Sequence, residues 1–130
     1  MTTGQTTDTP IIVPIDRRHV DDIARIHTAC FDEAWNARIL TRILAMPGTF
    51  ALGVRHGDVV TELLGFAIGR VAADECELLS LGVAPVSRGQ GLGAMMLDAA
   101  LVRAGSVDVR KFFLEVAENN IPALTLYKAR

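Results

Sequence analysis

Several features that would direct a protein to particular partners are scarce in this chain of 130 residues. Basic residues are not in excess, because 13 Lys and Arg stand against 15 Asp and Glu, which gives a net charge of −2. A nucleic-acid-binding domain normally carries a basic face, so this balance argues against a nucleic-acid partner. The apolar runs are far shorter than a membrane span and no basic-then-apolar leader precedes them, so we expect a cytoplasmic protein without a membrane partner.

Cysteine and metal-ligand patterns are also scarce. Cys30 and Cys76 lie far apart and neither belongs to a C-x-x-C pair, so we expect two reduced, buried thiols. No histidine has a metal-ligand spacing, and the sequence predicts no metal site. His27 falls on the apolar face of an expected helix, which favours a hydrogen-bonded core histidine over a catalytic one.

The length suits one domain with an ordinary core. Residues 1–9, rich in Thr with Gly and Gln, are typical of a flexible tail, and residues 10–130 form the domain. Apolar periodicity and turn residues predict an α/β (α+β) fold in the order β-α-α-β-β-β-α-β-α. We expect strands at 11–15, 49–55, 59–71, 76–83 and 111–116, and helices after Asp16 through residue 31 and at 34–46, 92–104 and 119–129.

A glycine-rich loop between the strand at 76–83 and the helix at 92–104 is the most informative motif. It has the sequence SRGQGLGA over residues 87–94. Backbone N–H groups at a helix N-terminus favour phosphate, glycine lets the backbone approach closely, and Arg88 adds a positive charge. The loop therefore predicts binding of a pyrophosphate, which both the nicotinamide or flavin dinucleotides and coenzyme A carry.

The dinucleotide alternative fits the loop better than it fits the rest of the chain. Gly89, Gly91 and Ala94 satisfy G-x-G-x-x-G/A. A dinucleotide-binding domain, however, places this loop after its first strand and follows it with two or more β-α units. Only one strand and one helix are expected after this loop, so the order of elements favours coenzyme A.

The strand, the R-x-x-G-x-G motif at Arg88, Gly91 and Gly93, and the apolar helix together resemble the acetyl-CoA loop of the GNAT superfamily of N-acetyltransferases. Residues 112–127 (FFLEVAENNIPALTLY) look like the following strand and helix of its RimI-type branch, which acetylates the N-terminal alanine of a ribosomal protein. The resemblance implies the GNAT fold, with a mixed, mostly antiparallel central sheet flanked by helices. It also implies acetyl-CoA as cosubstrate and a peptide or protein N-terminus, possibly that of a ribosomal protein, as partner.

Glu115 is the candidate general base. An α-amino group titrates at about pH 8 and must lose a proton before it attacks. Glu115 lies in an otherwise apolar strand, where partial burial would raise the pKa of its carboxyl toward a useful range. The resemblance implies that Tyr127 protonates the departing thiolate. The alternatives are an edge glutamate that reaches solvent and a tyrosine that packs in the core.

The resemblance also assigns the cofactor contacts. The pantetheine arm is expected to lie beside Leu81 to Val83 like an added strand, with the Val83 N–H as oxyanion donor. Gly82 indicates a local irregularity of that strand. Asn120 is expected to contact the cofactor, although it equally suits a helix cap. The predicted cofactor-binding residues are Leu81, Gly82, Val83, Arg88, Gly89, Gln90, Gly91, Leu92, Gly93, Ala94 and Asn120.

The sequence thus predicts acetyl transfer to a protein N-terminal amine by direct attack in a ternary complex, since no Ser or Cys stands where a covalent relay would need one. A small-molecule amine or antibiotic as acceptor and a non-catalytic acetyl-CoA-binding domain remain alternatives. In the superfamily two more strands usually follow the position of Tyr127, whereas this sequence stops at Arg130. We therefore expect a GNAT fold without its last C-terminal strands, most simply by truncation, with an exposed sheet edge that could pair in a homo-oligomer.

Overall fold

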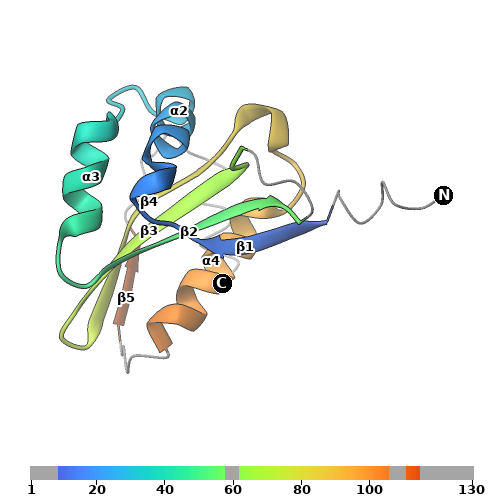
Figure 1. The fold of residues 1–130 in the computed structure, drawn as a ribbon. Coiled ribbons are helices and arrows are strands. Elements are labelled where there is room, and N and C mark those ends of the chain that lie inside the picture. The colour runs from blue at the N-terminus through green and yellow to red at the C-terminus, as the bar shows by residue number, and fades with distance from the viewer. Residues whose placement is uncertain (1–8, 58–61, 106–110, 115–130) are drawn as a thin grey trace.

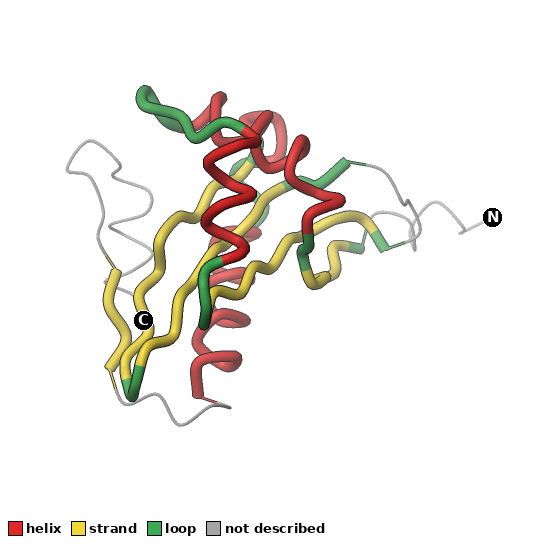
Figure 2. Tube along the Cα trace, turned by 60° about the vertical axis from the view of Figure 1, so that its left-hand side comes forward, coloured by secondary structure: helices red, strands yellow, loops and turns green. Residues whose placement is uncertain are grey.

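A five-stranded sheet forms the centre of the molecule, with helices on both of its faces (Figures 1 and 2). The computed structural model describes residues 9–57, 62–105 and 111–114. The elements are β1 (Pro10–Pro14), η1 (Arg17–His19), α2 (Val20–Cys30), α3 (Ala37–Ala45), β2 (Thr49–His56), β3 (Gly65–Ala72), β4 (Glu75–Val83), η2 (Pro85–Ser87), α4 (Leu92–Gly105) and β5 (Lys111–Leu114). The predicted order is confirmed through β5, and the predicted helix at 119–129 lies outside the described residues.

The sheet is mixed and mostly antiparallel, as predicted. Its strands lie in the order β1-β2-β3-β4-β5, and the first four are antiparallel to their neighbours. β5 runs parallel to β4, and α4 forms the crossover between them. Figure 2 shows α3 in front of the strands and α4 behind them. The sheet is therefore covered on opposite faces by α2 and α3 and by α4.

Each face of the sheet has its own apolar core. The α4 face is built from Phe50, Val54, Ala67, Cys76, Leu78, Leu92, Met96, Leu97, Ala100 and Ala104. The opposite face is built from Val20, Ile23, Ile26, Leu40, Ala51, Leu63, Phe66, Ile68 and Ala84. Fully burying one such side chain contributes about 1.5–3 kcal/mol, so the two cores hold β4 and the start of α4 in place.

Hydrogen-bonding side chains set two helix starts. Asp16 accepts a hydrogen bond from the Arg18 N–H at 2.9 Å, which confirms the predicted cap before the first helical segment. Asn36 accepts from the Ile39 N–H at 2.9 Å, so α3 begins at Ala37 and not at residue 34 as predicted. α3 ends at Ala45, one residue before the predicted end and just ahead of Pro47 and Gly48.

β4 contains an irregularity at Leu79, three residues before the predicted position at Gly82. Ile68 pairs with Ser80 and Gly69 pairs with Leu78, so Leu79 is an extra residue with no partner on β3. Gly82 pairs regularly with Phe66, and the predicted irregularity at Gly82 is wrong. A Cβ at Gly82 would lie 2.9 Å from the Phe66 ring, so this glycine makes room for a buried aromatic side chain.

β5 accompanies only the first part of β4. Lys111–Leu114 pairs with Glu75–Leu78, and no pairing of Leu79–Val83 with β5 occurs among the described residues. β3 also begins later than predicted, at Gly65 instead of residue 59, although residues 58–61 lie outside the described part. The last five residues of β4 therefore keep a strand neighbour on the β3 side alone within the described chain.

Candidate cofactor site

The glycine loop joins the end of β4 to α4. After β4 the chain turns through η2, where the Ser87 N–H donates to the Ala84 carbonyl at 2.8 Å. Gly89 and Gly91 adopt positive φ angles of 83° and 78°. A residue with a Cβ would lose roughly 1–2 kcal/mol in this left-handed conformation. Gly89 and Gly91 are therefore required by the conformation of the turn, and the predicted close approach of a phosphate to them stays a prediction.

The loop presents free backbone donors to open space. The Met95 N–H donates to the Gly91 carbonyl at 3.1 Å, so the N–H groups of Leu92, Gly93 and Ala94 precede the first bond of the helix ladder. A Cβ placed on Gly89 or Gly91 would meet no atom within 4 Å. Unpaired N–H groups at the positive end of a 14-residue helix form a favourable place for an anion.

The predicted loop residues contribute to this place in different ways. Gly89, Gln90 and Gly91 are exposed, whereas Leu92 is buried in the core on the α4 face. Only the backbone of Leu92 can therefore reach a ligand. Its buried side chain fixes where the first turn of α4 lies.

The backbone of β4 turns its polar groups outward at the predicted pantetheine residues. The Ala84 N–H donates to the Leu64 carbonyl at 2.8 Å, which makes Val83 and Gly65 a non-hydrogen-bonded pair of the antiparallel ladder. The N–H and C=O of Val83 thus point away from β3. Leu81 lies two residues earlier and shares this direction. An extended ligand could add to this edge through main-chain hydrogen bonds.

The side chain of Arg88 is directed back toward β4. Its Nε donates to the Val83 carbonyl oxygen at 3.2 Å, and its Nη2 lies 3.3 Å from Cys30 Sγ. Cys30 Sγ in turn donates to the same carbonyl oxygen at 3.4 Å. Both cysteines are free thiols as predicted, but Cys30 is half-buried whereas Cys76 is buried. The predicted interaction of the Arg88 guanidinium with a phosphate of the cofactor stays a prediction.

His27 is a core residue, as predicted. Its side chain is buried, and Nδ1 accepts a hydrogen bond from the Trp35 N–H at 2.9 Å. The imidazole stacks on Phe31 and Trp35 with centroid separations of 4.3 and 4.7 Å. Burial lowers the pKa of His27 below its ordinary value of 6.5, because the charged form loses hydration. The neutral imidazole therefore ties the segment between α2 and α3 to α2 through the Trp35 N–H.

Three predicted site residues are not placed. Glu115, Asn120 and Tyr127 lie outside the described residues, so the base, the amide contact and the proton donor stay predictions. Across residues 9–57, 62–105 and 111–114, no group of three His, Cys, Asp or Glu side chains could hold a metal ion. In the same ranges no helix has the length and apolar character that crossing a bilayer requires.

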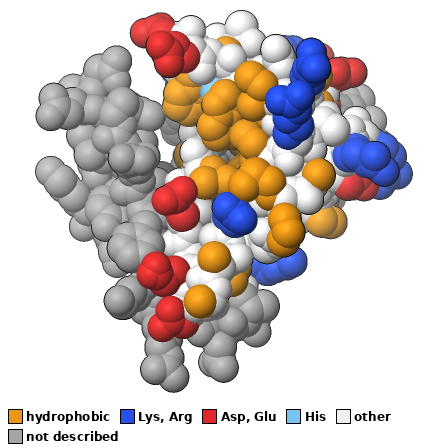
Figure 3. Space-filling model, turned by 90° about the vertical axis from the view of Figure 1, so that its left-hand side faces the viewer, with side chains coloured by type: hydrophobic (Ala, Val, Ile, Leu, Met, Phe, Trp, Pro, Cys, Tyr) orange, Lys and Arg blue, Asp and Glu red, His pale blue; other side chains and the backbone are white. Residues whose placement is uncertain are grey.

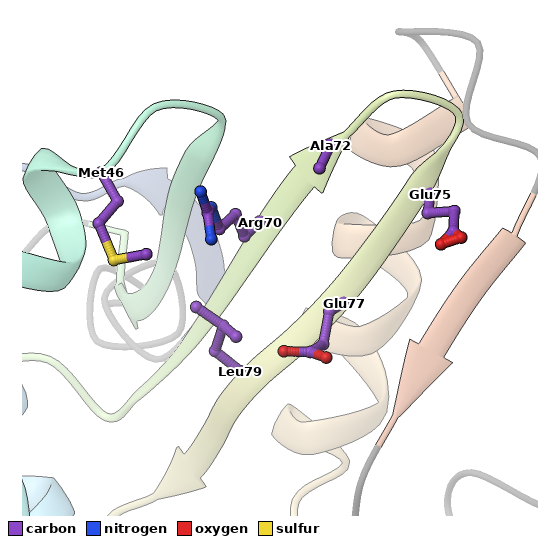
Figure 4. A pocket seen from close by; sticks show the side chains of 6 residues that line it. All are labelled: Met46, Arg70, Ala72, Glu75, Glu77 and Leu79. Carbon is purple, nitrogen blue, oxygen red and sulfur yellow. The ribbon is translucent and has the colours of Figure 1, made fainter.

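A cavity of about 230 Å³ lies at the hairpin end of β3 and β4, away from the glycine loop (Figure 4). It is lined by Met46, Arg70, Ala72, Glu75, Glu77 and Leu79. Arg70 Nε donates to the Pro47 carbonyl at 3.3 Å, which ties the strand to the end of α3. Figure 3 shows hydrophobic side chains gathered on the side of the molecule that carries α3. The sequence pattern did not indicate this cavity, because its walls come from segments far apart in the chain.

The geometry defines the class of protein. A parallel β4-loop-α4-β5 unit continues an antiparallel sheet, and the loop that joins β4 to α4 contains two left-handed glycines. The profile of the acetyltransferase (GNAT) family matches residues 20–130. The chain belongs to the GNAT acetyltransferase family, as the sequence resemblance predicted.

Individual relatives agree with this assignment. The chain is 33% identical over 101 residues to the N-alpha-acetyltransferase RimI of Mycobacterium tuberculosis. The aligned residues cover 75% of this chain and 61% of that protein. The crystal structure of the ribosomal-protein-S18-alanine N-acetyltransferase of Escherichia coli superposes with a TM-score of 0.83 at 21% identity, over 93% of this chain and 76% of the enzyme. Arabidopsis thaliana NAA60, crystallised with acetyl-CoA, gives a TM-score of 0.78 at 19% identity, over 93% and 82% of the two chains. The two structures establish the shared fold.

Proposed function

We propose that the protein binds acetyl-CoA at the glycine loop and transfers the acetyl group to a protein N-terminal amine. The observation that carries this proposal is the pair of left-handed glycines, Gly89 and Gly91, which face open space at the N-terminus of α4. The diphosphate would accept hydrogen bonds from the N–H groups of Leu92 to Ala94. The pantetheine arm would lie beside Leu81 to Val83 and pair with the outward main-chain groups of Leu81. The acetyl-CoA complex of the Arabidopsis structure supports the choice of cofactor.

The reaction would proceed by direct attack. Glu115 takes a proton from the acceptor ammonium, and the amine lone pair then forms a bond to the thioester carbonyl carbon. The Val83 N–H stabilises the oxyanion that develops, and collapse of the intermediate breaks the C–S bond. Tyr127 protonates the departing thiolate, the new amide nitrogen releases its second proton to solvent, and solvent returns a proton to Tyr127. Proximity of the two substrates in one cleft supplies much of the acceleration.

The acceptor would be the N-terminal alanine of a ribosomal protein. This choice rests on the Escherichia coli structure with the same fold, which is a ribosomal-protein-S18-alanine N-acetyltransferase. A peptide acceptor agrees with the apolar surface beside α3, where Ile39 is 38% exposed. The chain spans 61% of the Mycobacterium tuberculosis protein, and the experiment below tests whether these 130 residues are active.

The test measures thiol release from acetyl-CoA with peptides that begin with Ala, with peptides that begin with Pro, and with an aminoglycoside. We expect turnover with the Ala peptides and a thermal shift with coenzyme A but not with NAD. Glu115→Gln should lower kcat by roughly 100-fold or more at pH 7 while the coenzyme A Kd stays constant. Glu77→Gln, the same change at an exposed residue of β4, is the matched control. Stabilisation by NAD alone would contradict the cofactor, and turnover with the aminoglycoside alone would contradict the acceptor.

A further inference from the structure

The end of β4 is held by side chains where a neighbouring strand would otherwise hold it. β5 pairs with β4 only as far as Leu78, so no described strand bonds to the outward carbonyl of Val83. That oxygen instead accepts from Arg88 Nε at 3.2 Å and from Cys30 Sγ at 3.4 Å. A carbonyl oxygen has two lone pairs, and these two donors use both of them.

The peptide between Val83 and Ala84 is consequently fixed at both of its polar atoms. Its N–H, on Ala84, donates to the Leu64 carbonyl on the β3 side. Its carbonyl oxygen, on Val83, is held on the other side by Arg88 and Cys30. Arg88 Nη2 also contacts Cys30 Sγ at 3.3 Å, which completes a triangle between the loop, the end of β4 and the C-terminus of α2. A planar guanidinium with donors in a fixed fork suits two such contacts at once.

We infer that Arg88 is a positioning residue that orients the end of β4, with Cys30 as its second anchor, instead of a phosphate ligand. This inference rests on the proposed function, because Arg88 holds the carbonyl of Val83, and the N–H of the same residue, which points to the same side, is the proposed oxyanion donor. The positive charge is secondary to the geometry of the donors. The effect of Arg88 should therefore not depend on whether the acetyl donor carries a diphosphate.

A comparison of two donors separates the two roles. Acetyl-CoA carries the diphosphate, and S-acetylpantetheine carries the same thioester and arm without it. Arg88→Ala should lower kcat about tenfold or more with both donors and change KM little, because a positioning contact acts on the developing oxyanion. Arg88→Lys keeps the charge but not the fork, and it should not restore kcat. Arg38→Ala, on the exposed face of α3, is the control and should match the parent.

A second measurement needs no activity. Hydrogen exchange at the Ala84 amide reports how often the end of β4 opens, and it should rise about tenfold in Arg88→Ala while the Ala100 amide in α4 stays constant. A loss confined to acetyl-CoA, full restoration by Arg88→Lys, or unchanged exchange at Ala84 would each overturn the positioning role. If the parent protein binds no coenzyme A, the proposed function fails, while the exchange result still judges the role of Arg88.

Discussion

Two left-handed turns of this protein use glycine for different reasons. Gly48, before β2, has a φ of 81°, and a Cβ there would also collide with the Val71 carbonyl oxygen. Gly89 and Gly91, before α4, have similar φ angles of 83° and 78°, yet a Cβ on either would meet nothing within 4 Å. Both backbone conformation and packing require glycine at position 48, whereas backbone conformation alone requires it at positions 89 and 91.

The difference teaches where to look for a ligand. At Gly48 packing and conformation both require glycine, so any cost of substitution belongs to folding. At Gly89 and Gly91 conformation alone requires it, and the space that the missing side chains leave is unused by the described protein atoms. If a substitution at Gly89 or Gly91 weakens coenzyme A binding more than it lowers the stability of the free protein, the ligand occupies that space.

The largest effect is expected at the crowded turn. Gly48→Ala combines a left-handed alanine with overpacking against β3, and we expect a loss of about 3–5 kcal/mol in the free energy of unfolding. Urea denaturation measures it. Gly105→Ala, at the C-terminal end of α4 where a Cβ meets nothing, is the control and should change stability by about 1 kcal/mol or less. Equal losses at Gly48 and Gly91 would remove the contrast between the two turns.

The open loop should respond in affinity more than in stability. Gly91→Asn keeps a residue that tolerates positive φ but adds a side chain where the diphosphate is proposed to lie. We expect a loss of stability below about 1 kcal/mol and a coenzyme A Kd raised by roughly 10–100-fold, as isothermal titration calorimetry would show. Wild-type affinity in Gly91→Asn would mean that the ligand does not approach this part of the loop.

His27 extends the comparison to a residue that protein contacts explain fully. Since burial lowers its pKa, the unfolded chain binds a proton below about pH 6.5 more readily than the folded one does. The stabilisation is fully present above pH 6.5 and falls as the pH drops, by at most about 1.4 kcal/mol per pH unit. Urea denaturation between pH 5 and 8 measures the slope. His27→Phe should remove this part of the slope, and an unchanged slope would contradict the assignment.

The smallest effect is expected at the β3–β4 hairpin. Ala73 is the one described residue other than glycine with a positive φ, at 55°. Ala73→Gly relieves that strain but adds freedom to the unfolded chain, so we expect a net gain of about 1 kcal/mol or less. Thermal unfolding measures it. A clear destabilisation would show that the alanine side chain makes a contact worth more than the strain.

The sequence predicted the order of elements because each boundary carries a local signal. Asp16 caps the first helical segment, Pro47-Gly48 follows α3, and glycines precede α4. The start of α3 was placed too early, since apolar periodicity continued past the side-chain cap at Asn36. The open, left-handed form of the loop was predictable from its three glycines.

Side-chain directions were harder to predict. The spacing places Arg88 beside the loop, but only the fold brings Cys30 within 3.3 Å of its guanidinium and turns that guanidinium toward the end of β4. The extra residue in β4 could not be predicted from the sequence either. Leu78, Leu79 and Leu81 are all apolar, so their pattern does not show where the alternation between the two faces of the sheet shifts. The predicted proton donor, Tyr127, follows from family resemblance alone, whereas the predicted base, Glu115, also follows from its place in an apolar strand.

The unpaired residue in β4 has one further consequence. Cys76 and Leu78 pack beneath α4 before it, and Leu81 and Val83 pack on the same side after it, although the two pairs differ in the parity of their numbers. Removing Leu79 would delete this extra residue, so that Leu78 and Ser80 would become consecutive partners of Gly69 and Ile68, and Leu81 and Val83 would keep their side of the sheet. Loss of that one codon would thus straighten β4 while the strand end that leads into the glycine loop keeps the same face toward α4.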